Sequence, residues 1–296
     1  AFTTNGALTL NDTTGGLNVT GTVNAGTGLA SITTALGALA LGNNNVSGTG
    51  VTLQGAGVTS TGGTVNGGTG DILVNGGAGA ISLAGALTTT SNSAAAVTVH
   101  KATSVALANV TTGGTGTTTI GVGSDVTGAV TQTGVITTGT LTGSTNSTNS
   151  VTLGGLNVIT NLAAFTAKGL TVNDSAGGLN VTGAVNAGTG LASITTTGGN
   201  LAVTGAGSVT GTGVTLITTG LNDITLAGNV NGNAGNVTLT SGQAISQSAG
   251  VLNTTGTLTG SATTTASLNQ ANTIANLGAF TTNGALTLND TTGGLN

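Results

Sequence analysis

The sequence predicts an all-β fold, a parallel β-solenoid in which each turn of chain lies on the turn before it. Three observations predict it: long internal repeats, short alternating segments separated by Gly and Asn, and a nearly uncharged composition. The chain has 296 residues with 56 Gly, no Pro, no Cys, six acidic residues and two basic ones. Repetition at a fixed period is typical of solenoids and other repeat architectures.

The longest repeat spans 278 residues. Residues 1–18, AFTTNGALTLNDTTGGLN, recur unchanged at 279–296. A diverged copy of the same motif begins at Phe165, so the 278-residue unit divides into blocks of 163 and 115 residues. All three Phe residues, Phe2, Phe165 and Phe280, occupy this motif. The sequence therefore predicts one continuous solenoid over 1–296, with one full long repeat at 1–278 and the start of the next at 279–296.

A shorter period lies inside each block and defines the individual turns, or rungs. Strand-like segments begin at Leu8, Leu29, Val51, Asp71, Ala94, Thr117, near Ser144, and at Leu170, Leu191, Val214, Val237, near Ala262 and at Leu286. The mean spacing is about 23 residues, which gives about twelve rungs in each 278-residue repeat. Fourteen rungs of about 20 residues are an alternative that fits the motif spacing less evenly.

Each rung divides into about three short strands and their turns. Leu170 to Gly190 contains the runs LTVNDSAG, GLNVTGA and VNAGTG. In Val51-Thr52-Leu53 the alternation directs Val and Leu inward and Thr outward. Gly and Asn tolerate the left-handed backbone that tight corners require. The runs are too short and too rich in Gly for helices.

The composition also excludes several functions. Two Lys and no Arg could neutralise almost none of a nucleic-acid backbone, so we expect no nucleic-acid partner. No apolar run approaches the roughly 18 residues of a membrane helix, so we expect no membrane insertion. A column of identical charges about 4.8 Å apart would be repulsive, whereas Thr, Ser and Asn columns can form hydrogen bonds. A solenoid thus explains why charge is scarce.

The titratable residues predict no catalytic, cofactor-binding or metal site. His100 is the one histidine, too few for a triad or a metal cluster, and is interpreted as a surface or turn residue. Asp12, Asp174 and Asp290 share the ND position of the repeated motif, and Asp71 and Asp223 are also interpreted as equivalent; Asx turns and strand ends explain them. Asp125 stands alone.

The sequence also bears on three more specific activities, namely calcium binding, glycoside cleavage and ice binding. Gly67 to Asp71 matches a calcium-binding repeat imperfectly and only once. The absence of Glu and of clustered Asp argues against glycoside cleavage, and we expect no enzyme activity and no cofactor. An ice-binding face would need a Thr-x-Thr column on successive rungs, whereas the Thr runs at 88–90, 117–119 and 263–265 are scattered. Ice binding therefore stays a minor alternative.

Particular phrases carry a resemblance to a known family. AISQSAGVL, GTLTGS and NTIANLGAFT, within Val237–Asp290, are echoed in AVTQTGVITTGTLTGS and NVITNLAAFT within residues 129–168. These segments resemble the repeats of filamentous-haemagglutinin-like proteins, large surface or secreted proteins of Gram-negative bacteria that are often exported by two-partner secretion. The resemblance implies a right-handed β-helix, which agrees with the crossover preference of parallel strands, and an extracellular or cell-surface location.

The resemblance and the repeats together lead to a functional hypothesis. We expect a structural rod or filament segment of a giant extracellular repeat protein, serving adhesion, biofilm or an envelope matrix. The expected partners are further copies of the repeat, end to end, and lateral neighbours in a bundle, since a nearly uncharged surface repels its copies little. The alternative is a passive stalk that projects a receptor-binding adhesin tip.

Overall fold

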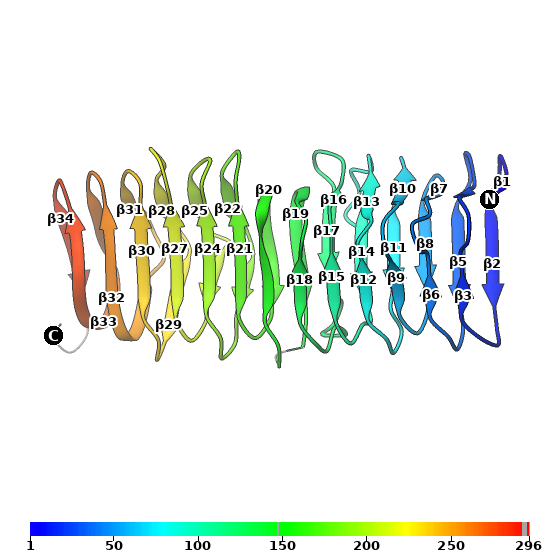
Figure 1. Cartoon of the computed structure of the whole chain (residues 1–296). Helices are drawn as coiled ribbons and strands as arrows, with labels where there is room; N and C mark the ends of the chain where they lie inside the picture. The colour runs from blue at the N-terminus through cyan, green and yellow to red at the C-terminus, as the bar shows by residue number, and fades with distance from the viewer. Residues whose placement is uncertain (147, 292–294, 296) are drawn as a thin grey trace. The chain divides into compact units, whose positions relative to one another are not determined.

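The computed structural model describes residues 1–146, 148–291 and 295, and within them the chain forms 34 strands and no helix. The strands pair in parallel and stack as a β-solenoid of about 13 turns spaced by about 22 residues, which confirms the predicted fold class (Figure 1). Two compact units divide the chain, Ala1–Asn149 and Ser150–Asn296. Each unit is a solenoid with three stacks of strands; one solenoid over 1–296 remains a prediction.

The first unit contains three stacks, named 1a, 1b and 1c in the order in which β2, β3 and β4 follow one another in the chain. Stack 1a contains β2 (Leu8–Asp12), β5 (Ala30–Thr34), β8 (Val51–Gln54), β11 (Ile72–Asn75), β14 (Val97–His100), β17 (Thr117–Ile120) and the end of β19 (Ile136–Ser144). Stack 1b contains β3 (Leu17–Asn18), β6 (Leu39–Ala40), β9 (Val58–Ser60), β12 (Ile81–Leu83), β15 (Val105–Leu107) and β18 (Val130–Gln132). Stack 1c contains β1 (Phe2–Thr3), β4 (Val23–Asn24), β7 (Val46–Ser47), β10 (Thr64–Gly68), β13 (Ala86–Thr89), β16 (Val110–Thr111) and the start of β19.

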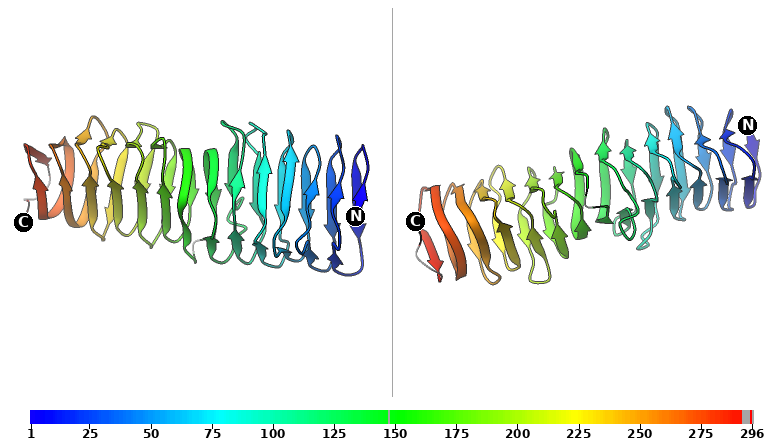
Figure 2. Two further views of the ribbon diagram at one scale, coloured as in Figure 1. Left: turned by 45° about the horizontal axis from the view of Figure 1, so that its top comes forward. Right: turned by 90° about the horizontal axis from the view of Figure 1, so that it is seen from below.

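The second unit repeats this arrangement in stacks 2a, 2b and 2c (Figure 2). Stack 2a contains the start of β20 (Val151–Thr166), β21 (Leu170–Asp174), β24 (Ala192–Thr196), β27 (Val214–Thr218), β30 (Val237–Ser241) and the end of β32 (Leu252–Ala262). Stack 2b contains β22 (Leu179–Val181), β25 (Leu201–Val203), β28 (Ile224–Leu226), β31 (Ile245–Gln247), the start of β33 (Ala266–Thr282) and β34 (Leu286–Asp290). Stack 2c contains the end of β20, β23 (Ala184–Asn186), β26 (Ser208–Thr210), β29 (Asn229–Asn233) and the start of β32.

The strand register corrects two predicted rung positions. The segments expected near Ser144 and near Ala262 begin earlier, because Thr118 pairs with Leu141 and Val237 pairs with Leu258. The short runs of the other rungs are fused here into longer strands, β19 and β32, and Gly139 and Gly256, just before the two rung starts, lie within these strands.

Each unit is held together by columns of stacked aliphatic side chains. In stack 1a, Ile32, Leu53 and Val74 lie in register on successive rungs, and all three are fully buried. In stack 2a, Ile194 and Leu216 form the same kind of column. Burial of each such side chain contributes about 1.5–3 kcal/mol. A narrow core of Val, Leu, Ile and Ala follows from this geometry.

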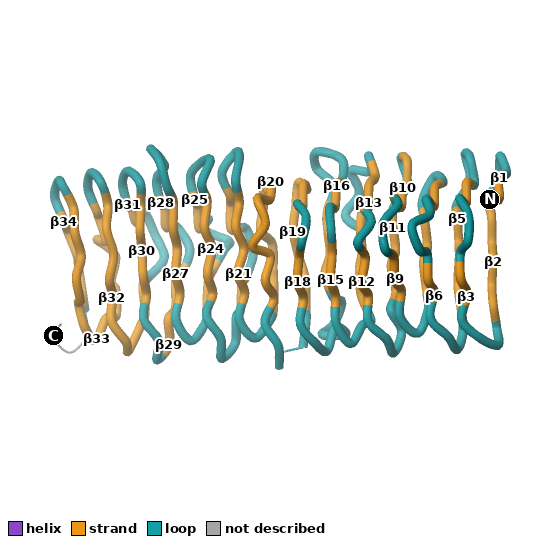
Figure 3. Tube along the Cα trace, in the orientation of Figure 1, coloured by secondary structure: helices purple, strands orange, loops and turns teal. Residues whose placement is uncertain are grey.

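Several corners are built by Asn-x-Gly segments, and the corners appear as teal loops between the strands in Figure 3. The Asn186 side chain accepts a hydrogen bond of 2.9 Å from the Gly188 backbone N–H, and Gly188 has a φ of 54°. A Cβ at the neighbouring Gly190 would lie 2.5 Å from the backbone nitrogen of Gly169 on the adjacent rung. Asn thus fixes the corner while Gly allows the rungs to approach.

The repeated LTLND motif changes stack within the second unit. Leu170 begins stack 2a, and its column continues through Ala192, Val214, Val237 and Leu258. Leu286 occupies the equivalent sequence position but pairs with Ala266 in stack 2b. The preceding rung is short, because Leu258 pairs with Leu277 only 19 residues later. Leu286 lies nine positions after Leu277, which takes the chain from stack 2a only as far as stack 2b.

Candidate functional site

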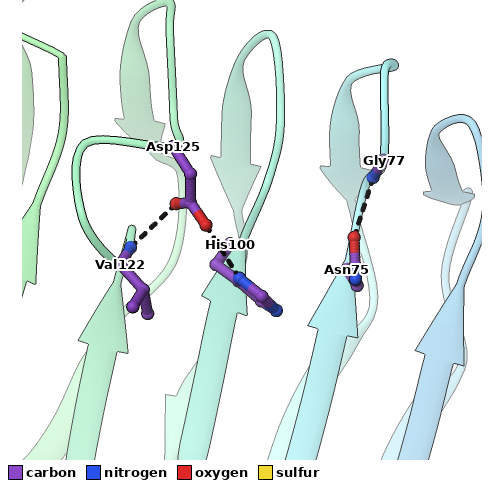
Figure 4. A network of polar contacts seen from close by, with 5 residues as sticks. All are labelled: Asn75, Gly77, His100, Val122 and Asp125. Carbon is purple, nitrogen blue, oxygen red and sulfur yellow. Dashed lines mark hydrogen bonds and ion pairs between the residues drawn. The ribbon is translucent and has the colours of Figure 1, made fainter.

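His100 pairs with an aspartate from the following turn. Its Nδ1 lies 2.9 Å from Oδ2 of Asp125, and the side chains of His100 and Asp125 are 16% and 22% exposed (Figure 4). The backbone N–H of Val122 donates a 2.8 Å hydrogen bond to Oδ1 of Asp125. Partial burial acts to raise the pKa of Asp125, but hydrogen bonds from Val122 and His100 outweigh it and leave that pKa below its ordinary value.

The position of this pair indicates a corner function. His100 ends β14 and lies beside Asn75, which caps its own corner by accepting a 2.9 Å hydrogen bond from the Gly77 N–H (Figure 4). Sequence analysis placed His100 at a turn, but the separation of 25 residues concealed its partner Asp125. Among the described residues no group of three His, Cys, Asp or Glu side chains could hold a metal ion.

Two other aspartates hold adjacent rungs together through hydrogen bonds to one carboxylate oxygen each. Oδ1 of Asp71 accepts hydrogen bonds of 2.6 and 2.7 Å from Ser91 and Ser93. Oδ1 of Asp223 accepts a 2.9 Å bond from the backbone N–H of Ala244. Asp71 precedes a strand of stack 1a and Asp223 precedes a strand of stack 2b, so their interpretation as equivalent residues is wrong. The same dipeptide, Asp-Ile, therefore occurs at two different corners.

The ND motif forms a polar clamp to the preceding rung at two places in the second unit. Oδ1 of Asp174 accepts a 2.8 Å hydrogen bond from the Ile159 N–H, and the Asn157 amide donates to the Asn173 carbonyl at 2.9 Å. At the second place, Oδ1 of Asp290 accepts a 2.9 Å bond from Ile274, and the Asn272 amide donates to Asn289 at 3.1 Å. We call these the first and second clamps. They join each copy of the motif to the long strand before it.

The first clamp contains a buried carboxyl oxygen without a hydrogen-bond partner. Asp174 is 1% exposed, and its Oδ2 makes no hydrogen bond. Burial raises the pKa of Asp174 from 3.8 to about 6, although the hydrogen bond from Ile159 acts in the opposite direction. Sequence analysis assigned Asp174 a strand-end function, but its burial depends on neighbouring rungs.

An outward column of hydroxyl groups runs along stack 2a. It comprises, in register, Thr152, Thr171, Ser193, Thr215, Thr238 and Thr259. Each of these residues is partly or fully exposed, and the hydroxyls of Thr238 and Thr259 lie 3.0 Å apart. We call this set the hydroxyl column. In stack 1a the corresponding column is interrupted by Leu73. The Thr runs at 88–90, 117–119 and 263–265 lie outside this column, and the register instead aligns residues that form no run in the sequence.

The first rung of unit 1 carries a shallow apolar recess. The recess has a volume of about 210 Å³, and its lining includes Phe2, Leu10, Leu17, Val19 and Val23. Phe2 is 52% exposed and Leu10 is 40% exposed.

Comparisons with protein-family models, with curated proteins and with solved structures find no match to this chain. Within the described residues no helix has the length and apolar character needed to cross a bilayer. The resemblance to filamentous-haemagglutinin-like repeats therefore remains an interpretation of the sequence.

Proposed function

We propose that the chain is a structural segment of an extracellular bacterial filament, built to continue along its axis by adding rungs. One observation carries this proposal: the same motif recurs in register-matched junctions, with the first and second clamps making the same contacts 115 or 116 residues apart. A junction of this kind lets a further copy of the motif join the preceding rung through the same hydrogen bonds. The long repeats, the scarcity of charge and the resemblance to surface proteins support an adhesive or matrix filament.

The location and the assembly can be tested together. An antibody raised against the chain should label fibres on the surface of the cells that encode it, as seen by immunogold electron microscopy. Bundled fibres would favour a matrix filament, whereas single fibres with distinct tips would favour the stalk alternative. Label confined to the cell interior, or labelled particles without fibres, would contradict a surface filament.

The hydroxyl column favours ice binding as a second candidate function. Rungs about 4.8 Å apart give the column a regular spacing, and stack 2a carries hydroxyl and methyl groups there without a charge. A rigid uncharged array of this kind can order water on its surface.

Ice binding requires a measurement of thermal hysteresis. We expect Thr215→Lys to abolish any hysteresis, because it places a charge within the hydroxyl column. Thr225→Lys, on the outward side of stack 2b, is the matched control and should retain it. Absence of hysteresis and of ice shaping in the unsubstituted chain would eliminate this candidate.

A further inference from the structure

One corner of the first unit brings an Asn-Gly dipeptide next to the His100–Asp125 pair. Asn75 ends β11, and Gly76 and Gly77 follow it. Asn75 and His100 are register partners on β11 and β14, so their side chains occupy one outward column with a spacing of about 4.8 Å. In Figure 4 the His100 ring lies between Asp125 and Asn75. An imidazole held by a carboxylate therefore lies beside an amide side chain.

An Asn-Gly dipeptide is the sequence in which a backbone nitrogen attacks a side-chain amide most readily. Glycine has no Cβ, so nothing shields its backbone nitrogen from the Cγ atom of the asparagine before it. The attack closes a cyclic imide and releases the side-chain nitrogen as ammonia. Water then opens the imide and leaves either aspartate or an isoaspartyl linkage. The conversion consumes water and releases ammonia, and it needs no oxidant or reductant.

The backbone of this corner already orients the reacting groups. The Gly77 N–H donates a 2.9 Å hydrogen bond to Oδ1 of Asn75, the atom on which negative charge develops when Cγ is attacked. The Gly76 N–H, which must lose its proton, donates a 3.1 Å bond to the His100 carbonyl and so is directed toward the His100 rung. Asn75 is partly exposed, so water can reach the imide.

His100 supplies the remaining requirement, which is a group that transfers protons. Ring closure needs a base for the Gly76 proton and an acid for the departing nitrogen, and an imidazole can serve both purposes near neutral pH. Oδ2 of Asp125, 2.9 Å from Nδ1, holds the ring and leaves its Nε2 on the side of β11 (Figure 4). The strands on either side of β14, β11 and β17, carry no titratable side chain. Asp125 is thus a positioning residue for this reaction.

We propose that Asn75–Gly76 is a self-modifying site, at which His100 promotes the conversion of Asn75 to aspartate or isoaspartate. His100 takes the Gly76 proton as the Gly76 nitrogen bonds to Cγ of Asn75. The bond from Cγ to Nδ2 then breaks, and His100 delivers the proton to Nδ2, which leaves as ammonia. Water opens the imide and places a new carboxylate beside His100, in a chain with only six acidic residues. The reaction is independent of the proposed structural function.

Two other corners provide matched controls within the same molecule. Asn66–Gly67 and Asn231–Gly232 carry the same dipeptide, and their side chains accept the same kind of hydrogen bond, from Gly68 at 2.8 Å and from Asn233 at 3.0 Å. Asn231 is partly exposed, as Asn75 is. Their register partners are all uncharged and comprise Ser47, Thr88, Thr210 and Asn253. These corners therefore lack only the neighbouring imidazole.

Peptide mapping by mass spectrometry measures the three sites in one sample, after incubation of the folded full-length chain at neutral pH and digestion. We expect Asn75 to convert at least about tenfold faster than Asn66 and Asn231, because only Asn75 has a group for acid–base catalysis beside it. In concentrated urea the three sites should convert at similar rates, since unfolding separates His100 from Asn75. Equal rates at the three sites in the folded chain would overturn the proposal.

Substitution of His100 separates proton transfer from the backbone geometry. In His100→Ala the rate at Asn75 should fall to that at Asn231, while unchanged rates at Asn66 and Asn231 show that the chain remains folded. Added imidazole should restore the rate at Asn75 more than it raises the rate at Asn231, which a purely structural function of His100 would not produce. An undiminished rate at Asn75 in His100→Ala would contradict the proposal.

The positioning function of Asp125 is tested through its dependence on His100. Asp125→Asn should lower the rate at Asn75 several-fold in the chain that contains His100, because the ring is held less firmly. The same substitution should leave that rate unchanged in His100→Ala, since Asp125 acts only through the imidazole. Equal effects of Asp125→Asn in both backgrounds would show that Asp125 acts on the corner itself and would contradict its positioning function.

Discussion

The first rung and its equivalent in the second unit show how one motif acquires two environments. Phe2 is 52% exposed, whereas Phe165 is fully buried. Leu10 is 40% exposed, whereas its equivalent Val172 is also fully buried. Because the motifs are so similar, the difference arises from the adjoining rungs. Stability in this fold thus resides in the contacts between rungs more than within a rung.

The polar residues of the motif show the same contrast. Within the described residues the Asp12 carboxylate accepts hydrogen bonds from Thr14 alone, two residues away, whereas Asp174 is buried and reaches the preceding rung at Ile159. The acidic group is identical, but its surroundings differ in dielectric and in hydrogen bonding. Stacking therefore changes the chemistry of the motif as well as its packing.

The largest difference should come from truncation of the aromatic side chain. Phe165→Ala should reduce the free energy of unfolding by about 3–5 kcal/mol, because it leaves a cavity in a packed column. Phe2→Ala is the matched variant and should cost less than about 1 kcal/mol, since Phe2 is half exposed. Urea titrations followed by circular dichroism measure both. Equal losses would show that the burial difference has no energetic consequence.

The next largest effect should depend on pH. The pKa of Asp174 is raised from 3.8 to about 6, so the folded chain binds this proton more tightly than the unfolded chain. This proton therefore adds about 3 kcal/mol to the free energy of unfolding at low pH. The contribution is fully present below about pH 4 and is lost as the pH rises through about 6. Asp174→Asn should remove this dependence and stabilise the chain at pH 8, whereas Asp12→Asn should change little. If the free energy of unfolding of Asp174→Asn varied with pH in the same way as that of the unsubstituted chain, this would contradict the effect expected from the buried Asp174 carboxyl.

The smallest effect should come from the third copy of the motif, at the last rung. Leu286 is 36% exposed, whereas Leu170 is 1% exposed. Leu286→Ala should reduce the free energy of unfolding by about 1 kcal/mol and Leu170→Ala by about 2–5 kcal/mol. The same urea titrations apply. If Leu286→Ala were as costly as Leu170→Ala, the exposure of the last rung would not reflect its contribution.

Much of the fold could be predicted from the sequence, because its causes are local. Alternation in segments such as Val51–Leu53 and the Asn-x-Gly corners specify short strands and tight turns. The identical ends specify repetition. The long strands β20 and β33 could not be predicted in the same way, since the Gly and Asn residues at their bends, such as Gly154 and Asn269, lie within continuous strands. The change of stack at Leu286 follows from those strands and was missed with them.

The candidate sites depend on register, and local sequence carries little information about it. His100 and Asp125, or Asn157 and Asp174, meet only because an intervening turn has a particular length. The hydroxyl column also joins residues that are isolated in the sequence, such as Ser193 and Thr215. Alignment by rung, with a spacing of about 22 residues, would have revealed the column.

The move of the LTLND motif from stack 2a to stack 2b means that the block length is not a whole number of turns. A tandem array that continued with the same offset would present the motif on each of three sides in succession and return to the first side after three offsets. No single side would then accumulate all copies of a surface feature.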